Sequence, residues 1–181
     1  MPHRLFVALR PPPAVRDALI DLMEGERDIR WQDDDQLHLT LRYIGEVDRH
    51  DADAIAAALG RIVFAPFPVS LTGTGTFARK GKVHTLYAGV TPSAALAALQ
   101  SKIERTCVMA GLEPEQRKFA PHVTIARLNR SSGDLRSFLS HTAGFAAGPW
   151  ACDAFHLYES HLAPGGPLYE RAASFPATSA A

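Results

Sequence analysis

The sequence has no long apolar run, only two cysteines and no net charge. No apolar stretch approaches the roughly 20 residues that are needed to cross a bilayer. The N-terminal segment "MPHRLFVALR" contains only a short apolar stretch, and no small-residue cleavage site follows it. We therefore expect neither a membrane anchor nor a signal peptide. Cys107 and Cys152 stand far apart without a CxxC motif, which indicates free thiols in a reducing cytoplasm.

The balance of charges limits how the chain could bind nucleic acid. Nineteen Lys and Arg residues balance nineteen Asp and Glu residues. We therefore do not expect the whole surface to bind a long nucleic acid electrostatically. Any contact with RNA must be local. We expect about two cationic contacts at most, from Arg127 and a neighbour such as Arg42 or Lys82, and hence a gentle dependence of binding on salt.

Motifs for metal hydrolysis are absent as well. The sequence contains neither HExxH nor HxH, the spacings that place metal ligands together. Asp33–Asp35 forms the only acidic cluster, and we expect it to be a solvated polar loop. We therefore expect no metal and no other cofactor.

What the sequence does contain is strands and helices in alternation. Its 181 residues, of which 46% are hydrophobic, suit one globular domain or two small lobes that share a core. The glycines and cations of "TGTFARKGK", residues 74–82, suggest an exposed turn between two strands. Apolar periodicity predicts strands at 5–9, 36–44, 67–73, 82–90, 120–128, 153–160 and 167–173, with helices at 13–24, 52–63, 96–107 and 133–140.

A weak internal repeat organises these elements. "RLFVALRP" at 4–11 aligns with "TLYAGVTP" at 85–92, and an amphipathic helix follows each. A second strand and a second helix come next in both halves. Each half therefore reads strand, helix, strand, helix, strand, and a duplicated unit of this kind would pack as two similar lobes about a pseudo-twofold axis.

The second strand of each half carries the same polar pair. "QLHLTLRYIGEV" at 36–47 holds His38 and Thr40, and "FAPHVTIARL" at 119–128 holds His122 and Thr124. Side chains of a strand alternate between its faces, so each His and Thr share one face while aliphatic residues occupy the other. Eight His and ten Thr give about 0.4 chance H-x-T matches. Two matches at equivalent places in a repeat therefore point to a site.

Two His and two Thr suit in-line displacement at a phosphodiester. This reaction needs a base on the attacking oxygen and an acid on the leaving oxygen, and imidazole, which titrates near pH 6.5, can serve as either. A Thr hydroxyl can donate to the non-bridging oxygens of the phosphate. The facing ring nitrogens should then lie roughly 5–9 Å apart, which leaves room for phosphorus between them.

These segments resemble the paired H-x-T-x motifs of the two-histidine (2H) phosphoesterases. The resemblance is strongest to the bacterial RNA 2',3'-cyclic phosphodiesterases, also called 2'-5' RNA ligases or LigT-like proteins. It extends over nearly the whole chain through "RLFVAL", "RWQDDDQLHLTL" and, near the end, "FHLYESHLAPGGPLYE". It implies an α+β fold of two duplicated lobes, with mainly antiparallel sheets around a central cleft. Residues 1–176 would form this one domain and 177–181 a frayed tail.

The resemblance also implies roles for individual residues. His38 would be the proton donor, His122 the proton acceptor, and Thr40 and Thr124 the phosphate ligands. Arg127 matches an Arg that this branch of the family carries five residues after the second His. Strict alternation puts Arg127 on the face opposite His122, so either the strand bulges or Arg127 is a surface cation. Arg42 shares the His38 face and is a weaker candidate.

The implied activity is hydrolysis of RNA 2',3'-cyclic phosphate ends to 2'-phosphomonoesters without a metal, with reversal to 2'-5' ligation in some members. The implied partner is RNA with such an end, tRNA fragments among the candidates, bound by a cytoplasmic monomer. One alternative is a related esterase for small cyclic nucleotides or 2',5'-oligonucleotides. Another is a non-catalytic module that binds RNA ends.

Overall fold

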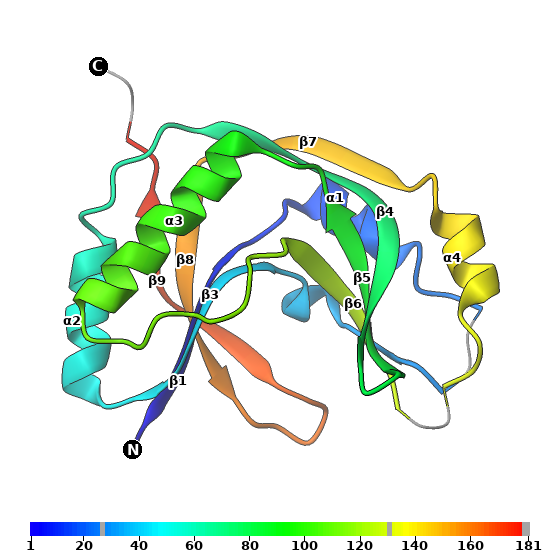
Figure 1. Cartoon of the computed structure of the whole chain (residues 1–181), viewed down its shortest axis with the longest axis horizontal. Helices are drawn as coiled ribbons and strands as arrows, with labels where there is room; N and C mark the ends of the chain where they lie inside the picture. Colours follow the sequence, from blue (N-terminus) through cyan, green and yellow to red (C-terminus); the bar gives the residue numbers. More distant parts are fainter. Residues whose placement is uncertain (26–27, 130–131, 179–181) are drawn as a thin grey trace.

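The computed structural model describes residues 1–25, 28–129 and 132–178. Their strands form one sheet in the order β7-β4-β5-β6-β3-β1-β8-β9, with β2 added beside β6 (Figure 1). Every strand pairing recorded in this part of the chain is antiparallel. The expected mainly antiparallel α+β fold is therefore confirmed. The strands are β1 (His3–Leu9), β2 (Arg30–Trp31), β3 (Leu39–Val47), β4 (Phe67–Arg79), β5 (Lys82–Val90), β6 (His122–Arg127), β7 (Ala146–Cys152), β8 (Ala154–His161) and β9 (Leu168–Pro176).

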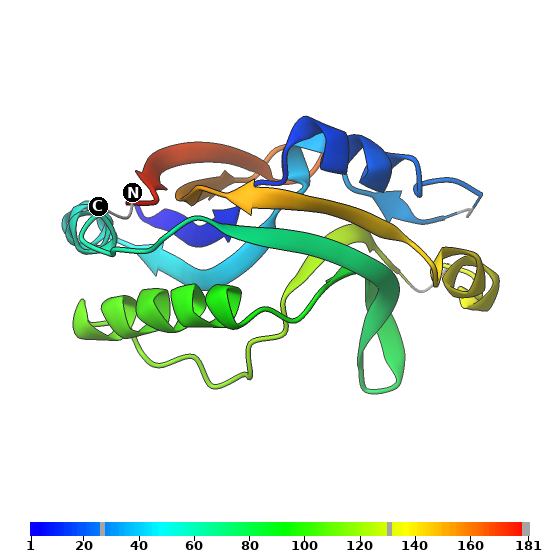
Figure 2. The ribbon, with the colours of Figure 1, turned by 90° about the horizontal axis from the view of Figure 1, so that it is seen from above.

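In the part of the chain that the structure describes, four α-helices cover the sheet. They are α1 (Pro13–Ile20), α2 (Arg49–Leu59), α3 (Ala94–Met109) and α4 (Arg136–Thr142). Helix α3 packs against α2 and β3, whereas α1 contacts β7 and α4 contacts β4, so that the two helix pairs lie over different halves of the sheet (Figures 1 and 2). Among the helices of the described residues, none has the length and apolar character to cross a membrane.

Local sequence explains where the helices begin and which face they bury. Pro13 begins α1, a position that lacks a helical hydrogen-bond partner in any case. Ser93 caps α3 by accepting a hydrogen bond from the Leu96 amide. The buried residues of α3 recur every three or four positions: Leu96, Leu99, Ile103 and Cys107. At about 2 kcal/mol for each buried leucine, this stripe fixes the helix on the sheet.

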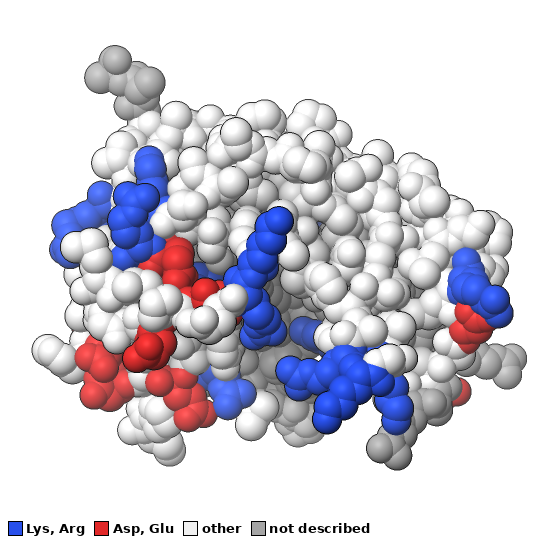
Figure 3. Space-filling view, in the orientation of Figure 1, with Lys and Arg blue, Asp and Glu red and all other residues white. Residues whose placement is uncertain are grey.

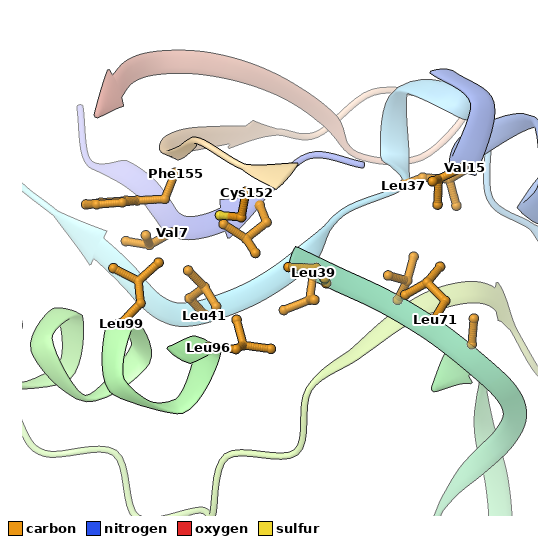
Figure 4. Close-up of a cluster of buried hydrophobic side chains, with 14 of the residues drawn as sticks. Val7, Val15, Leu37, Leu39, Leu41, Leu71, Leu96, Leu99, Cys152 and Phe155 are labelled. Atoms are coloured by element: carbon orange, nitrogen blue, oxygen red, sulfur yellow. The ribbon is translucent and has the colours of Figure 1, made fainter. Parts of the chain in front are cut away.

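The core lies beneath the motif strands. Leu37, Leu39 and Leu41 are buried. Leu41 lies beside Leu96 and Leu99 of α3, whereas Leu37 lies beside Val15 of α1 (Figure 4). Because strand side chains alternate, this packing leaves His38 and Thr40 on the other face. Both cysteines are buried and free, and burial raises the pKa of the Cys107 thiol to about 11.

The structure corrects several expected boundaries. The exposed turn predicted for residues 74–82 is wrong: β4 continues to Arg79, and only Lys80 and Gly81 form the turn, both with positive φ, as a tight hairpin requires. The predicted helix 13–24 already ends at Ile20. Strand β7 was not predicted, because Gly148–Pro149 reads as a turn. It is an edge strand, where a proline is tolerated. Of the tail predicted to fray, residues 179–181 lie outside the described residues.

Candidate active site

The two motif strands are neighbours in the sheet. β3 pairs with β6 antiparallel, with Leu39 opposite Val123. Extending this register by one residue sets His38 opposite Thr124 and Thr40 opposite His122, since antiparallel partners run in opposite directions. The two histidines are then diagonal neighbours, whose Cβ atoms lie roughly 7–8 Å apart in a regular sheet. The same seam therefore brings both H-x-T pairs to one place.

A β-bulge follows each motif at the same position. On β3, Thr40 and Arg42 pair with consecutive residues of β1, which leaves Leu41 as the extra residue. On β6, Thr124 and Ala126 pair with consecutive residues of β5, which leaves Ile125 as the extra residue. Each bulge reverses the alternation of side chains beyond it. The residue five positions after each His therefore returns to the face on which the His lies.

The bulge at Ile125 decides the question of Arg127. Ile125 and Ala126 are both buried, and Arg127 reaches the same cleft as His122 and Thr124. Its Nη1 donates a hydrogen bond to Thr85 Oγ1 at 2.9 Å. Thr85 is only 1% exposed, and its hydroxyl also lies 2.8 Å from Nδ1 of His84. A buried hydroxyl thus fixes the guanidinium. Sequence reasoning missed Thr85, although it lies within the strand predicted at 82–90.

The bulge at Leu41 has the opposite effect on Arg42. Arg42 is 7% exposed, and its guanidinium is held by the Glu104 carboxylate at 2.5 Å and by two backbone carbonyls, those of Tyr43 and Glu113. Because its guanidinium is buried and already bonded to these three partners, Arg42 is a structural residue. The position equivalent to Arg127 belongs instead to Tyr43, which is 49% exposed and lines the cleft.

Both motif histidines are oriented by the same hydrogen bond. Nδ1 of His38 lies 2.7 Å from the carbonyl oxygen of Gln36, and Nδ1 of His122 lies 2.7 Å from that of Ala120. Because a carbonyl can only accept, each Nδ1 carries the proton. Each Nε2 is left as the nitrogen available to a ligand.

Aromatic rings pack around each imidazole. Phe6 and Tyr169 lie with ring centroids 4.8 and 5.1 Å from that of His38. Phe77 and Tyr87 lie 4.7 and 5.5 Å from that of His122. Phe6 and Tyr87 are the two aromatics that the internal repeat aligns, so the repeat extends to the packing of the site. These contacts restrict each ring to the orientation that its Nδ1 bond selects.

Burial also changes the acid–base properties of the pair. It lowers the pKa of His38 to about 4, to which the charges of His122 and Arg127 contribute. Burial lowers the pKa of His122 too, again helped by Arg127. Both imidazoles are therefore mainly neutral in the ligand-free protein near pH 7. A bound phosphate anion would oppose this effect by stabilising the protonated form of either ring.

The five residues singled out from the sequence line one cleft. It has a volume of about 770 Å³, and its walls include His38, Thr40, His122, Thr124 and Arg127. In the described part of the chain, no three His, Cys, Asp or Glu side chains are grouped so that they could hold a metal ion. The Asp33–Asp35 cluster is not simply solvated, because Asp34 forms ion pairs with Arg10 and Arg16 at 3.3 and 3.0 Å.

Comparisons with known proteins show which family the chain resembles. A family model described as the 2'-5' RNA ligase superfamily matches residues 11–163. A relative from Aeropyrum pernix, named RNA 2',3'-cyclic phosphodiesterase, is 33% identical over 141 residues, which cover 76% of this chain and 80% of the relative. A relative of the same name from Thermotoga maritima is 31% identical over 173 residues, which cover 92% of this chain and 91% of the relative.

Solved structures show the same fold. The protein TT0787 of Thermus thermophilus matches with a TM-score of 0.77 at 26% identity, over 96% of this chain and 97% of its own. E. coli LigT complexed with 3'-AMP matches with a TM-score of 0.80 at 24% identity, over 99% of this chain and 100% of its own.

Proposed function

Because this chain belongs to the 2'-5' RNA ligase superfamily, we propose that it hydrolyses the 2',3'-cyclic phosphate at an RNA end to a 2'-phosphomonoester. The relatives' name, RNA 2',3'-cyclic phosphodiesterase, supports this substrate. The observation that carries the proposal is the pair of imidazoles on adjoining strands, each with Nδ1 bonded to a carbonyl and Nε2 left for a ligand.

In the proposed reaction the two histidines act on opposite sides of phosphorus. Nε2 of His122 takes a proton from a water molecule as the water oxygen bonds to phosphorus. The bond between phosphorus and O3' breaks, and O3' takes a proton from Nε2 of His38, whose ring the bound phosphate stabilises in the protonated form. The 2' oxygen keeps the phosphate. Each proton transfer of this kind contributes roughly 10²–10⁴ in rate.

The remaining cleft residues hold the phosphate and the nucleoside. The hydroxyls of Thr40 and Thr124 would donate to the non-bridging oxygens, and Arg127 would offer two parallel N–H donors to the same group. Thr85 keeps the guanidinium in place. Tyr43, exposed at the position equivalent to Arg127, would stack on the terminal base, since an aromatic face accepts any base.

The product of a short RNA with a 2',3'-cyclic end tests the proposal. We expect a 2'-phosphate, which resists a 3'-specific phosphatase, and we expect the same rate from His50→Ala, which changes an exposed histidine of α2. A 3'-phosphate product would mean that O2', and not O3', is the leaving oxygen. An unchanged substrate would contradict the activity itself.

The same residues would also support 2'-5' ligation. If a 5'-hydroxyl of a second RNA took the place of water, His122 would accept its proton and His38 would protonate O3', which gives a 2'-5' linkage. The superfamily description favours this second activity. Incubation of two RNA fragments, one with a cyclic end and one with a 5'-hydroxyl, should yield a joined product that is lost in His122→Ala.

A further inference from the structure

The tip of the β4–β5 hairpin carries three cations in four residues. Arg79, Lys80 and Lys82 are all exposed. Within the described ranges, no carboxylate lies within 4 Å of any of them. The hairpin therefore presents unneutralised positive charge.

This arrangement does not stabilise the hairpin. Arg79 and Lys82 are partners in the ladder, and like charges placed directly opposite each other destabilise a strand pair. Lys80 adds a third charge in the turn between them. A negatively charged ligand would offset this repulsion.

The hairpin borders the proposed catalytic cleft. Arg79 lines the same cleft as His122 and Arg127. It lies two residues beyond Phe77, the ring that packs on His122, which is about 7 Å along an extended strand. A chain that continues from a phosphate held at His122 would meet the hairpin next.

Cations also line the opposite wall of the cleft. Arg117 and Lys118 belong to the loop between α3 and β6, which projects from the same side of the sheet as the hairpin (Figure 2). Arg117 has a long pair with Glu115 at 3.6 Å. Lysine and arginine side chains border the hollow in the middle of this face (Figure 3). Apart from the ion pair of Arg42 with Glu104, the lining includes four cations, Arg79, Arg117, Lys118 and Arg127, against one carboxylate, Glu115.

The cleft is therefore positive although the chain as a whole is neutral. We propose that Arg79, Lys80 and Lys82, with Lys118 opposite them, bind the internucleotide phosphates of an RNA strand whose end lies between His38 and His122. This inference rests on the proposed function and deepens it: the nucleotides next to the cyclic end contribute to binding, so an oligonucleotide is a better substrate than a mononucleotide. It replaces the sequence-based expectation of two cationic contacts at most.

Salt dependence of RNA binding tests the proposal. The probe is a short single-stranded RNA that ends in a 2'-phosphate, the proposed product, so that no turnover occurs during the measurement. The test variant is Arg79→Gln with Lys82→Gln, and the control is Arg49→Gln with Arg61→Gln, which removes the same charge from exposed positions outside the cleft lining. Binding is followed by fluorescence anisotropy at about 50 and 200 mM salt.

Each phosphate contact contributes about 0.7 to the slope of log affinity against log salt for a single strand. Two lost contacts lower the slope by about 1.4, so between these salt concentrations the control should lose about sevenfold more affinity than the test variant. Equal slopes in the two variants, or no binding of the RNA by the wild-type protein, would overturn the subsite.

Hydrolysis of a 2',3'-cyclic mononucleotide separates this proposal from the proposed function. The test variant should lose more kcat/KM on an oligonucleotide than on the mononucleotide, because only the oligonucleotide has internucleotide phosphates. Equal losses on both substrates would contradict the subsite and leave the hydrolysis standing. Absence of hydrolysis by the wild-type protein would contradict the function, and the binding slopes would still decide the subsite.

Discussion

Acidification should destabilise the fold through the side chain of His38. The pKa of His38 is lowered from 6.5 to about 4 by burial, so between these values the unfolded chain binds a proton that the folded chain does not. Stability is then fully present above about pH 6.5 and is lost as the pH falls toward 4. At about 1.4 kcal/mol for each tenfold difference in proton affinity, the loss from this one group is about 2 kcal/mol at pH 5 and about 3 kcal/mol at pH 4.

Substitution by glutamine isolates this contribution. His38→Gln has no titrating group at the position, so its stability should fall less between pH 7.5 and 5 than that of the wild type. Burial also lowers the pKa values of His122 and His156, but these residues are present in both proteins and their contributions cancel. The free energy of unfolding is measured from urea titrations followed by the fluorescence of Trp31 and Trp150. Exposed His50 provides the matched control, and His50→Gln should follow the wild type.

The reasoning fails if His38→Gln and the wild type lose the same free energy of unfolding between pH 7.5 and 5. Such a result would mean that the His38 ring takes up a proton in the folded protein as readily as in the unfolded chain. The ring would then be hydrated, and the enclosed packing by Phe6 and Tyr169 would not describe the protein in solution.

Three further predictions concern turnover. Thr85→Val should lower kcat about tenfold without unfolding the protein, because Arg127 loses a hydrogen bond that orients it. Thr85→Ser should keep the wild-type rate, because serine retains the hydroxyl. Equal rates in the two variants would show that the Thr85 hydroxyl does not orient Arg127. Tyr43→Ala should reduce kcat/KM by about tenfold or more through lost stacking, and Tyr43→Phe should restore it, whereas failure of the phenylalanine would point to the hydroxyl. The pH profile of kcat/KM should be bell-shaped, and its optimum should lie at a lower pH than that of kcat. The reason is that the histidine pKa values are lowered in the free protein, whereas a bound phosphate raises them. Coincident optima would contradict this prediction.

Much of the site could be predicted from alternation alone. The H-x-T pattern within aliphatic residues fixes which face His38 and Thr40 share, and the repeat predicts that the second motif lies nearby. The repeat even relates Phe6 to Tyr87, which pack on the two histidines. These features depend on local periodicity, and local periodicity is visible in a sequence.

The bulges could not be predicted, and they decide the rest of the site. Nothing in "HLTLRY" or "HVTIAR" marks Leu41 or Ile125 as an extra residue, since a bulge depends on the partner strand. If the bulges are ignored, strict alternation predicts that Arg42 lies on the face of His38 and that Arg127 lies on the face opposite His122. The ion pair of Arg42 with Glu104 likewise depends on a helix 62 residues away in the sequence.

The hairpin was misjudged for a related reason. Glycines and cations at 74–82 are typical of a loop, yet pairing between β4 and β5 continues to Arg79 and Lys82. Backbone pairing across a tight turn outweighs the weak strand preference of these residues. As a consequence, the extended hairpin places Arg79 at the border of the cleft.

The most direct test of the account is hydrolysis of a short RNA with a 2',3'-cyclic end, in the presence of a chelator, by the wild type and by His38→Ala and His122→Ala. We predict that the chelator leaves the wild-type rate unchanged, because one imidazole would deprotonate the attacking oxygen and the other would protonate the leaving oxygen without a metal ion. Each single variant should lose roughly 10²–10⁴ in turnover, and the double variant less than the product of the two losses. A wild-type rate abolished by the chelator, or either single variant with near-wild-type turnover, would contradict the two-histidine mechanism.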